Sequence, residues 1–280
     1  MVLSRDVAGV RTRLPAATAR AWDWRQGAPT ADAFEGVEAV IHLAGEPVAE
    51  GRWTEEKKNR IRESRREGTR RLVEGLAALA SPPKVLVCAS AVGYYGEAGD
   101  HDLEETSPPG TDFLAGVCVE WEREAMAATS LGVRVVCVRI GVVLGRGGGA
   151  LARMLTPFRL GLGGRLGSGK QWMPWVALDD VVGIFLHALS SPGVEGALNA
   201  AAPTPVTNAE FTRALGRVLH RPAILPVPAA ALRAAFGDLA GVLLCSQKVL
   251  PRRTLASGYA FQHVDLASCL RTLVTDPPTG

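Results

Sequence analysis

Residues 86–96, Leu-Val-Cys-Ala-Ser-Ala-Val-Gly-Tyr-Tyr-Gly, carry the strongest indication of fold class in this chain. They begin with an apolar run, which is typical of a strand buried on both faces of a parallel sheet. The run ends at Ser90, and a turn rich in glycine and tyrosine follows. Open α/β sheets carry their chemistry at the carboxyl ends of the strands, where a serine can hydrogen-bond a carbonyl or an alcohol. Ser90 is therefore the first candidate site residue.

Strand-like and helix-like segments alternate along the chain around this stretch. Apolar runs predict strands at 37–43, 85–89 and 133–140. Helices are expected over the following segments: 54–80, 112–129, 150–160 and 179–190, the last beginning with the capping pair Asp179-Asp180. The alternation predicts an α/β protein with a Rossmann-like, doubly wound parallel sheet and helices on both faces.

The pattern loosens from about residue 161, where several prolines divide the chain into short elements. We expect residues 1–160 to form the sheet domain, and 179–200 to return to it. The rest of 161–280 would form a small α+β lobe on the substrate side, ending in a region of unknown function.

Composition excludes several classes of protein. The net charge of +3 is too small to indicate a nucleic-acid partner. No run of about 18 uncharged apolar residues is present, so we expect no membrane partner. The five cysteines are odd in number and show no C-x-x-C spacing, which favours reduced thiols in the cytoplasm and no metal site.

Other motifs accompany the serine strand. The strand at 37–43 runs into Leu43-Ala44-Gly45, whose small residues would let the backbone approach a flat ligand. Ser64-Arg65-Arg66-Glu67-Gly68-Thr69 lies on the next helix. Further along come Arg139-Ile-Gly-Val-Val-Leu-Gly145, Arg146-Gly-Gly-Gly149 and Gly167-Ser-Gly-Lys-Gln-Trp-Met-Pro-Trp175.

Together these segments resemble the extended short-chain dehydrogenase/reductases, and in particular family 39U, the epimerase-family proteins. The resemblance covers essentially the whole chain, and Gly141-Val-Val-Leu-Gly-Arg-Gly-Gly-Gly149 is its most specific piece. It implies an NADP cofactor and an oxidoreductase or epimerase reaction on a small, nucleotide-sugar-like substrate.

The resemblance also implies roles for single residues. Ser90 would orient a substrate oxygen. Ser4 and Arg5 would hold the 2′-phosphate of NADP, because a guanidinium can bind phosphate in a bidentate manner. The other residues implied to line the cofactor are Leu43, Ala44, Gly45, Arg65 and Val143. Structural alternatives remain open for these residues. Leu43-Ala44-Gly45 could form a simple turn, Arg65 could lie on a solvated basic helix face, and Ser4-Arg5 could be a charged chain start.

One departure from the family pattern affects the chemistry. Ordinary members carry Tyr-x-x-x-Lys after the serine strand, and the lysine lowers the pKa of the catalytic tyrosine. This chain has Cys118-Val-Glu-Trp-Glu122 in that place. Tyr94 or Tyr95, in the turn after Ser90, or Glu122 could act instead. The alternatives are that the tyrosines form a buried aromatic turn and that the glutamate is structural. Cys118 is expected in the core. A catalytically weak or inactive, cofactor-binding regulatory protein similar to cell-division inhibitors therefore remains the competing function.

A second departure concerns the beginning of the family pattern. No Gly-x-x-Gly-x-x-Gly turn precedes Val2. We expect the first βα unit to be missing, which would leave the strand at Val2 and the strand at 37–43 without a partner between them. Such a chain would bind NADP(H) poorly and fold marginally, and an in-frame extension of roughly 25–30 residues would restore both. Substrate and oligomeric state are not predicted.

Overall fold

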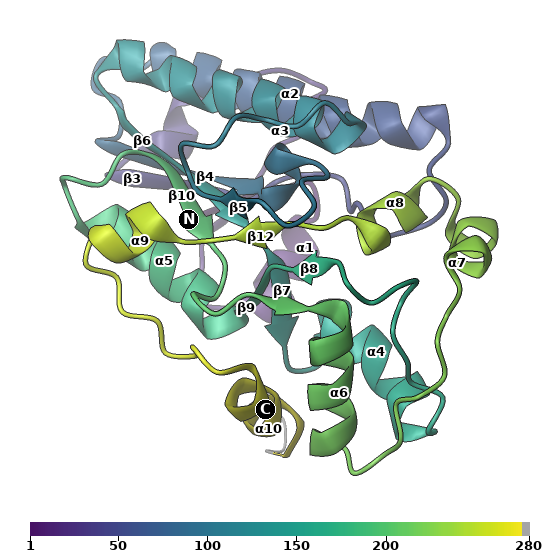
Figure 1. Ribbon diagram of the computed structural model, residues 1–280. Helices are drawn as coiled ribbons and strands as arrows, with labels where there is room; N and C mark the ends of the chain where they lie inside the picture. The colour runs from purple at the N-terminus through teal and green to yellow at the C-terminus, as the bar shows by residue number, and fades with distance from the viewer. Residues whose placement is uncertain (276–280) are drawn as a thin grey trace.

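A four-stranded parallel sheet lies at the centre of the structure, a computed structural model that describes residues 1–275. Its order is β10 (Gly196–Ala200), β6 (Arg134–Ile140), β4 (Val85–Ala91) and β3 (Ala39–His42). Helices α2 (Glu55–Ala77) and α3 (Phe113–Met126) lie side by side on one face, and α5 (Leu178–Ser190) lies on the other (Figure 1). The predicted α/β fold with helices on both faces is confirmed.

Strand β4 is the buried middle of this sheet. Residues 85–90 are all less than 9% exposed, because β3 and β6 flank the strand and helices cover both of its faces. Packing of these apolar residues against α3 and α5 forms the main hydrophobic core. The 310 helix Val92–Tyr95 follows at once and turns the chain away from the sheet. This is the strand-then-turn arrangement expected from residues 86–96.

The first strands form a separate small sheet. Strand β1 (Val2–Ser4) pairs in parallel with β2 (Ala19–Ala21), and α1 (Val7–Arg13) connects the two. Within residues 1–275, no hydrogen-bonded ladder joins β1 to β3. Apolar Ile41 on β3 is consequently 44% exposed. Among residues 1–275, no strand pairs with both β1 and β3, and the missing first βα unit stays a prediction.

The later part of the chain builds a second core beside the sheet. Strand β7 (Val142–Gly145) pairs in parallel with β9 (Trp175–Ala177). Around them pack α4 (Gly149–Arg159), α6 (Asn208–Val218) and α10 (Leu266–Thr275). The remaining elements are short: β5 (Asp102–Leu103), β8 (Trp172–Met173), β11 (Val206–Thr207), α7 (Ala229–Phe236), α8 (Leu239–Leu244), β12 (Lys248–Val249), α9 (Arg252–Ala256), and the 310 helices Ala31–Phe34 and Ala127–Leu131. Helix α4 packs with α6 and α10, although the sequence pattern predicted residues up to 160 to lie in the sheet domain. In the described part of the chain, no helix is long and apolar enough to span a membrane.

The predicted capping pair at the start of α5 is wrong. The helix begins at Leu178, so both aspartates lie inside its first turn, where their charge favours the helix amino end without capping it. Asp180 is fully buried and accepts hydrogen bonds from the backbone N–H groups of Gln262 and His263, at 2.7 and 3.0 Å. It also accepts one from Tyr259 Oη at 3.1 Å. Asp180 therefore holds the C-terminal segment against the helix.

Candidate functional site

A cavity of about 740 Å³ opens at the carboxyl ends of β4 and β6. Its floor is formed by residues 89–91 and 140–142, where the two strands end. Helices α2 and α3 form one wall. The opposite wall comes from the C-terminal elements, chiefly residues 171–174 and 241–245. The sequence placed the site at this edge of the sheet, and the structure forms its cavity there.

Ser90 lies in the floor and is 3% exposed. Its hydroxyl donates a hydrogen bond to Oε1 of Glu122 at 2.6 Å. The donor and the acceptor come from β4 and from α3, the helix that covers this face of the sheet. Because the proton of Ser90 is engaged, the lone pairs of its oxygen remain available to accept a hydrogen bond.

Arg139 completes this group from the neighbouring strand. It is paired in register with Ser90, so the two side chains project from the same face of the sheet. Its Nε donates to Oε1 of Glu122 and its Nη2 donates to Oε2, both at 2.8 Å. Burial opposes the charged form of Arg139, but the hydrogen bonds and charge of Glu122 together raise its pKa. Glu122 is thus held as one partner of a buried bidentate ion pair.

The network continues from Arg139 into the turn after β4. Its Nη1 donates to Tyr95 Oη and to the carbonyl of Glu105, both at 3.1 Å. Tyr95 in turn donates to Oδ1 of Asn199 on β10 at 2.7 Å. Burial raises the pKa of Tyr95 to about 12, so its hydroxyl remains protonated at neutral pH. These contacts fix the turn and leave Tyr95 in a structural role.

Tyr94 and Cys118 were the other candidates near Ser90. The guanidinium of Arg139 lies 3.4 Å above the ring centre of Tyr94, and Tyr94 does not line the cavity. Cys118 does line it, but burial raises the pKa of the thiol to about 12. An uncharged thiol is a poor nucleophile, which agrees with the core role expected for this cysteine.

Arg65 brings a positive charge to the cavity from α2. Its Nη1 donates to the carbonyls of Glu46 and Ile61 at 3.0 and 3.2 Å, and its guanidinium lies 5.0 Å from the ring centre of Trp121. It forms no ion pair with a carboxylate of residues 1–275, and burial lowers its pKa. A Cβ placed on Gly45 would lie only 3.0 Å from Cζ of Arg65. The structure therefore brings together two of the predicted cofactor residues, Gly45 and Arg65.

Two buried polar contacts tie the end of β3 to α2. Ser64 Oγ accepts a hydrogen bond from the backbone N–H of Glu46 at 2.9 Å. His42 Nε2 lies 3.0 Å from Thr69 Oγ1, and burial lowers the pKa of His42 to about 4. The segment around Gly45 is thereby anchored to the helix that carries Arg65.

Arg65 lines this cavity, whereas Gly45 and the other predicted cofactor residues lie outside its lining. Leu43 is 62% exposed, and Ala44 beside it is also exposed. Arg5 is exposed at the end of β1, where Ser4 Oγ accepts a hydrogen bond from the backbone of Asp6 at 3.0 Å. Val143 packs against the main core, and Val142 faces the cavity instead because successive strand residues point to opposite sides.

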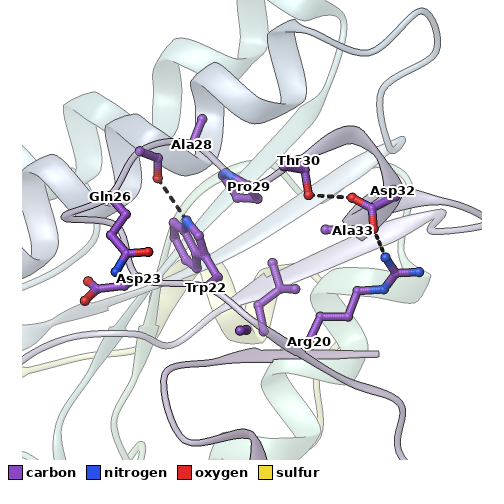
Figure 2. Close-up of a pocket in the computed structure, with 12 residues that line it drawn as sticks. Arg20, Trp22, Asp23, Gln26, Ala28, Pro29, Thr30, Asp32 and Ala33 are labelled. Carbon is purple, nitrogen blue, oxygen red and sulfur yellow. Dashed lines mark hydrogen bonds and ion pairs between the residues drawn. The ribbon is translucent and has the colours of Figure 1, made fainter.

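A second pocket, of about 450 Å³, lies beside β2 (Figure 2). Arg20 and Asp32 form an ion pair in its lining, and Trp22 Nε1 donates to the carbonyl of Gly27 at 3.1 Å. Ser4 and Arg5 do not line it.

Several residues of the cavity, and of the hydrogen-bond network beside it, were not identified from the sequence. Arg139 was noted only as the start of a motif, although a charge inside an otherwise apolar strand was a signal of special function. Trp53, Phe113 and Met154 line the cavity but lie far apart along the chain, so no local pattern could have united them.

Known proteins share both the sequence and the fold. Residues 2–201 match the model of the NAD dependent epimerase/dehydratase family, and residues 227–273 match Domain of unknown function (DUF1731). The mouse epimerase family protein SDR39U1 is 44% identical over 241 residues, which are 85% of this chain and 82% of the mouse protein. The epimerase family protein MT2273 of Mycobacterium tuberculosis is 41% identical over 259 residues, covering 91% of this chain and 85% of that protein.

Solved structures extend the comparison. The crystal structure of human epimerase family protein SDR39U1 (isoform 2) with NADPH superposes with a TM-score of 0.80 at 38% identity, covering 95% of this chain and 94% of that chain. A nucleoside-diphosphate sugar epimerase from Corynebacterium glutamicum superposes with a TM-score of 0.73 at 33% identity, covering 91% of this chain and 50% of that chain.

Proposed function

The chain belongs to the NAD dependent epimerase/dehydratase family, and from this premise we propose that it binds NADP(H) and acts as an oxidoreductase or epimerase on a small molecule. The observation that carries the proposal is the cavity at the end of β4, where Ser90 and the cationic Arg65 line one space. The human relative crystallised with NADPH supports the choice of cofactor. The sheet part would hold the cofactor and the C-terminal elements the substrate.

The residues present fit such a cofactor. Arg65 offers a guanidinium that forms no ion pair with a carboxylate of residues 1–275, and the absence of a side chain on Gly45 lets this guanidinium lie against the backbone there. Arg5 is exposed beside Ser4 and would bind the 2′-phosphate. Leu43, Ala44 and Val143 remain proposed cofactor contacts. When bound, NADP(H) would supply the hydride donor or acceptor.

The chain's own residues would handle the substrate proton. Ser90 donates its proton to Glu122, so its oxygen would accept a hydrogen bond from a substrate hydroxyl in the cavity. The substrate proton would pass to Oγ of Ser90 as the proton of Ser90 passes to Oε1 of Glu122. Arg139 would hold the carboxylate in place for this transfer. Tyr94 stays a proposed catalytic residue, although it lies outside the cavity lining.

A regulatory role without turnover is the second candidate. Glu122 would have to accept a proton while Arg139 binds both of its oxygens, and an ion pair of this kind stabilises the carboxylate. Tyr95 does not act as a lysine-assisted tyrosine in place of Glu122, since burial raises rather than lowers the pKa of Tyr95. The arrangement therefore favours slow turnover.

Calorimetric titration with NADPH and NADH tests the cofactor proposal. NADPH should bind more tightly, and Arg5→Ala should weaken NADPH binding roughly tenfold or more, as expected when a charge-assisted hydrogen bond is lost, with little change for NADH. Arg11→Ala, which removes another exposed arginine from α1, is the matched control. Equal losses for both cofactors in Arg5→Ala would contradict the assignment, and an absence of NADPH binding would refute the function.

The wider setting is also a proposal. All five cysteines are free, and four of them are buried, which supports a reducing compartment such as the cytoplasm. The small net charge supports a small-molecule partner rather than nucleic acid.

A further inference from the structure

We infer that the cavity at the end of β4 takes an apolar, phosphate-free alcohol and not a nucleotide sugar. The inference rests on the proposed function, because it assigns a substrate class to the same site. The inferred substrate class differs from the one in the name of the Corynebacterium relative, a nucleoside-diphosphate sugar epimerase.

The first argument is the apolar part of the cavity lining. Large aromatic and aliphatic side chains from several elements form it: Trp53, Phe113, Leu114, Met154, Trp172, Met173, Val242 and Leu243. Trp53 and Phe113 meet edge to face, with their ring centres 5.5 Å apart. Binding of an apolar ligand to such a surface is favourable because water is released from both apolar surfaces. Binding of a sugar there gains little free energy.

The second argument is charge. Lys58 is the cation of the lining besides Arg65, and its Nζ is 2.6 Å from Asp238 and 2.9 Å from Glu55. The hydrogen bonds that Lys58 donates to these two carboxylates raise the pKa of Lys58. Two more carboxylates, Glu97 and Asp112, also line the space. A diphosphate there would face three acids, one cation that is already paired, and Arg65, which the proposed function assigns to the cofactor, so its desolvation would not be compensated.

The third argument is the state of the polar side chains. Gln247 Nε2 donates to the carbonyls of Val92 and Gly96, both at 3.0 Å. Gln171 Nε2 donates to the carbonyl of Leu166 at 3.0 Å, and Asn208 Oδ1 accepts from the backbone N–H of the same residue at 2.8 Å. One polar atom of each of these side-chain amides is thus hydrogen-bonded to the protein's own backbone.

The oxygen of Ser90 is therefore the polar atom best placed for a substrate. The Ser90 hydroxyl donates its hydrogen bond to Glu122, so toward a ligand the Ser90 oxygen accepts a hydrogen bond and does not donate one. The ligand that satisfies it is a hydroxyl, and an otherwise apolar body would fill the rest of the space. The cavity of about 740 Å³ is shared with the cofactor of the proposed function, so the substrate would be a small molecule.

Binding in the presence of saturating NADPH tests the inference. The probes are trans-2-decalol, its parent hydrocarbon decalin, UDP-glucose and UDP-glucuronic acid, each titrated by calorimetry. Decalol should bind at least about tenfold more tightly than decalin, and more tightly than either UDP-sugar. Tighter binding of a UDP-sugar overturns the inference, and so does an absence of decalol binding by protein that binds NADPH. Failure to bind NADPH instead refutes the proposed function.

Two variants locate the binding. Leu114→Gln places an amide in the apolar part of the cavity lining and should weaken decalol binding roughly tenfold. Val119→Gln makes a similar change at an exposed position of the same helix, outside the lining, and should change it less than about twofold. NADPH affinity and the melting temperature, measured on both variants, show whether each is folded. Equal decalol affinity in the two folded variants would overturn the assigned site.

Discussion

Replacing Glu122 by glutamine should strongly destabilise the protein. The side chains of Arg139 and Glu122 are 5% and 13% exposed, and two hydrogen bonds of 2.8 Å join them. Glutamine keeps the shape but removes the charge, so the guanidinium is left buried without a counter-ion. Loss of one partner of a buried pair costs about 3–5 kcal/mol in the free energy of unfolding. At about 2–3 °C per kcal/mol, the melting temperature should fall by roughly 6–15 °C.

An exposed ion pair provides the matched control. Glu56 lies 2.9 Å from Arg60 on α2, and its side chain is 84% exposed. Glu56→Gln should change the free energy of unfolding by less than about 1 kcal/mol. Thermal and urea unfolding followed by circular dichroism would measure both variants.

The double variant Glu122→Gln/Arg139→Gln separates charge from packing. The double variant should have a higher free energy of unfolding than Glu122→Gln alone, because no unpaired charge remains buried. If Glu122→Gln unfolds at the same temperature as Glu56→Gln, the ion pair does not stabilise the end of β4, and the reasoning about Ser90 fails with it.

Three further outcomes are expected. His42 has its pKa lowered from 6.5 to about 4, so the unfolded chain binds its proton first and stability falls as pH drops from about 6.5 to 4. The loss should reach about 3 kcal/mol, and His42→Gln should lose this part of the pH dependence in urea unfolding curves. Cys118 should resist iodoacetamide at pH 7.5 in the folded protein, and Cys118→Ala should bind NADPH normally; rapid labelling would contradict the raised thiol pKa of about 12. Gly45→Ala should displace Arg65 and weaken NADPH binding, whereas Gly193→Ala, which meets no neighbour within 4 Å, should leave NADPH affinity unchanged in calorimetry.

Glu122 illustrates how a sequence prediction and the structure can differ. The sequence offered it as a replacement base or as a structural residue. In the structure it is both a hydrogen-bond acceptor for Ser90 and half of a buried ion pair. Glu122 lies on helix α3 and its partner Arg139 lies 17 residues away on strand β6, so no local pattern predicts the pairing.

Local patterns were enough for the main elements. The apolar run at 85–91, the alternation of strands and helices, and the position of Ser90 at a strand end all follow from residues close together in sequence. Hydrophobic periodicity reports which face of an element is buried, and the handed connections of parallel strands then bring strand ends to one edge. For this reason the fold class and the floor of the cavity could be predicted.

Tertiary structure alone decided what surrounds Ser90. Register between β4 and β6 set Arg139 beside it, and packing of α3 on the sheet supplied Glu122 from 32 residues away. The apolar part of the cavity lining joins segments from Trp53 to Leu243 that share no motif. Such contacts depend on how faces pack together, and a side chain's own neighbours in sequence do not encode which distant residue will meet it.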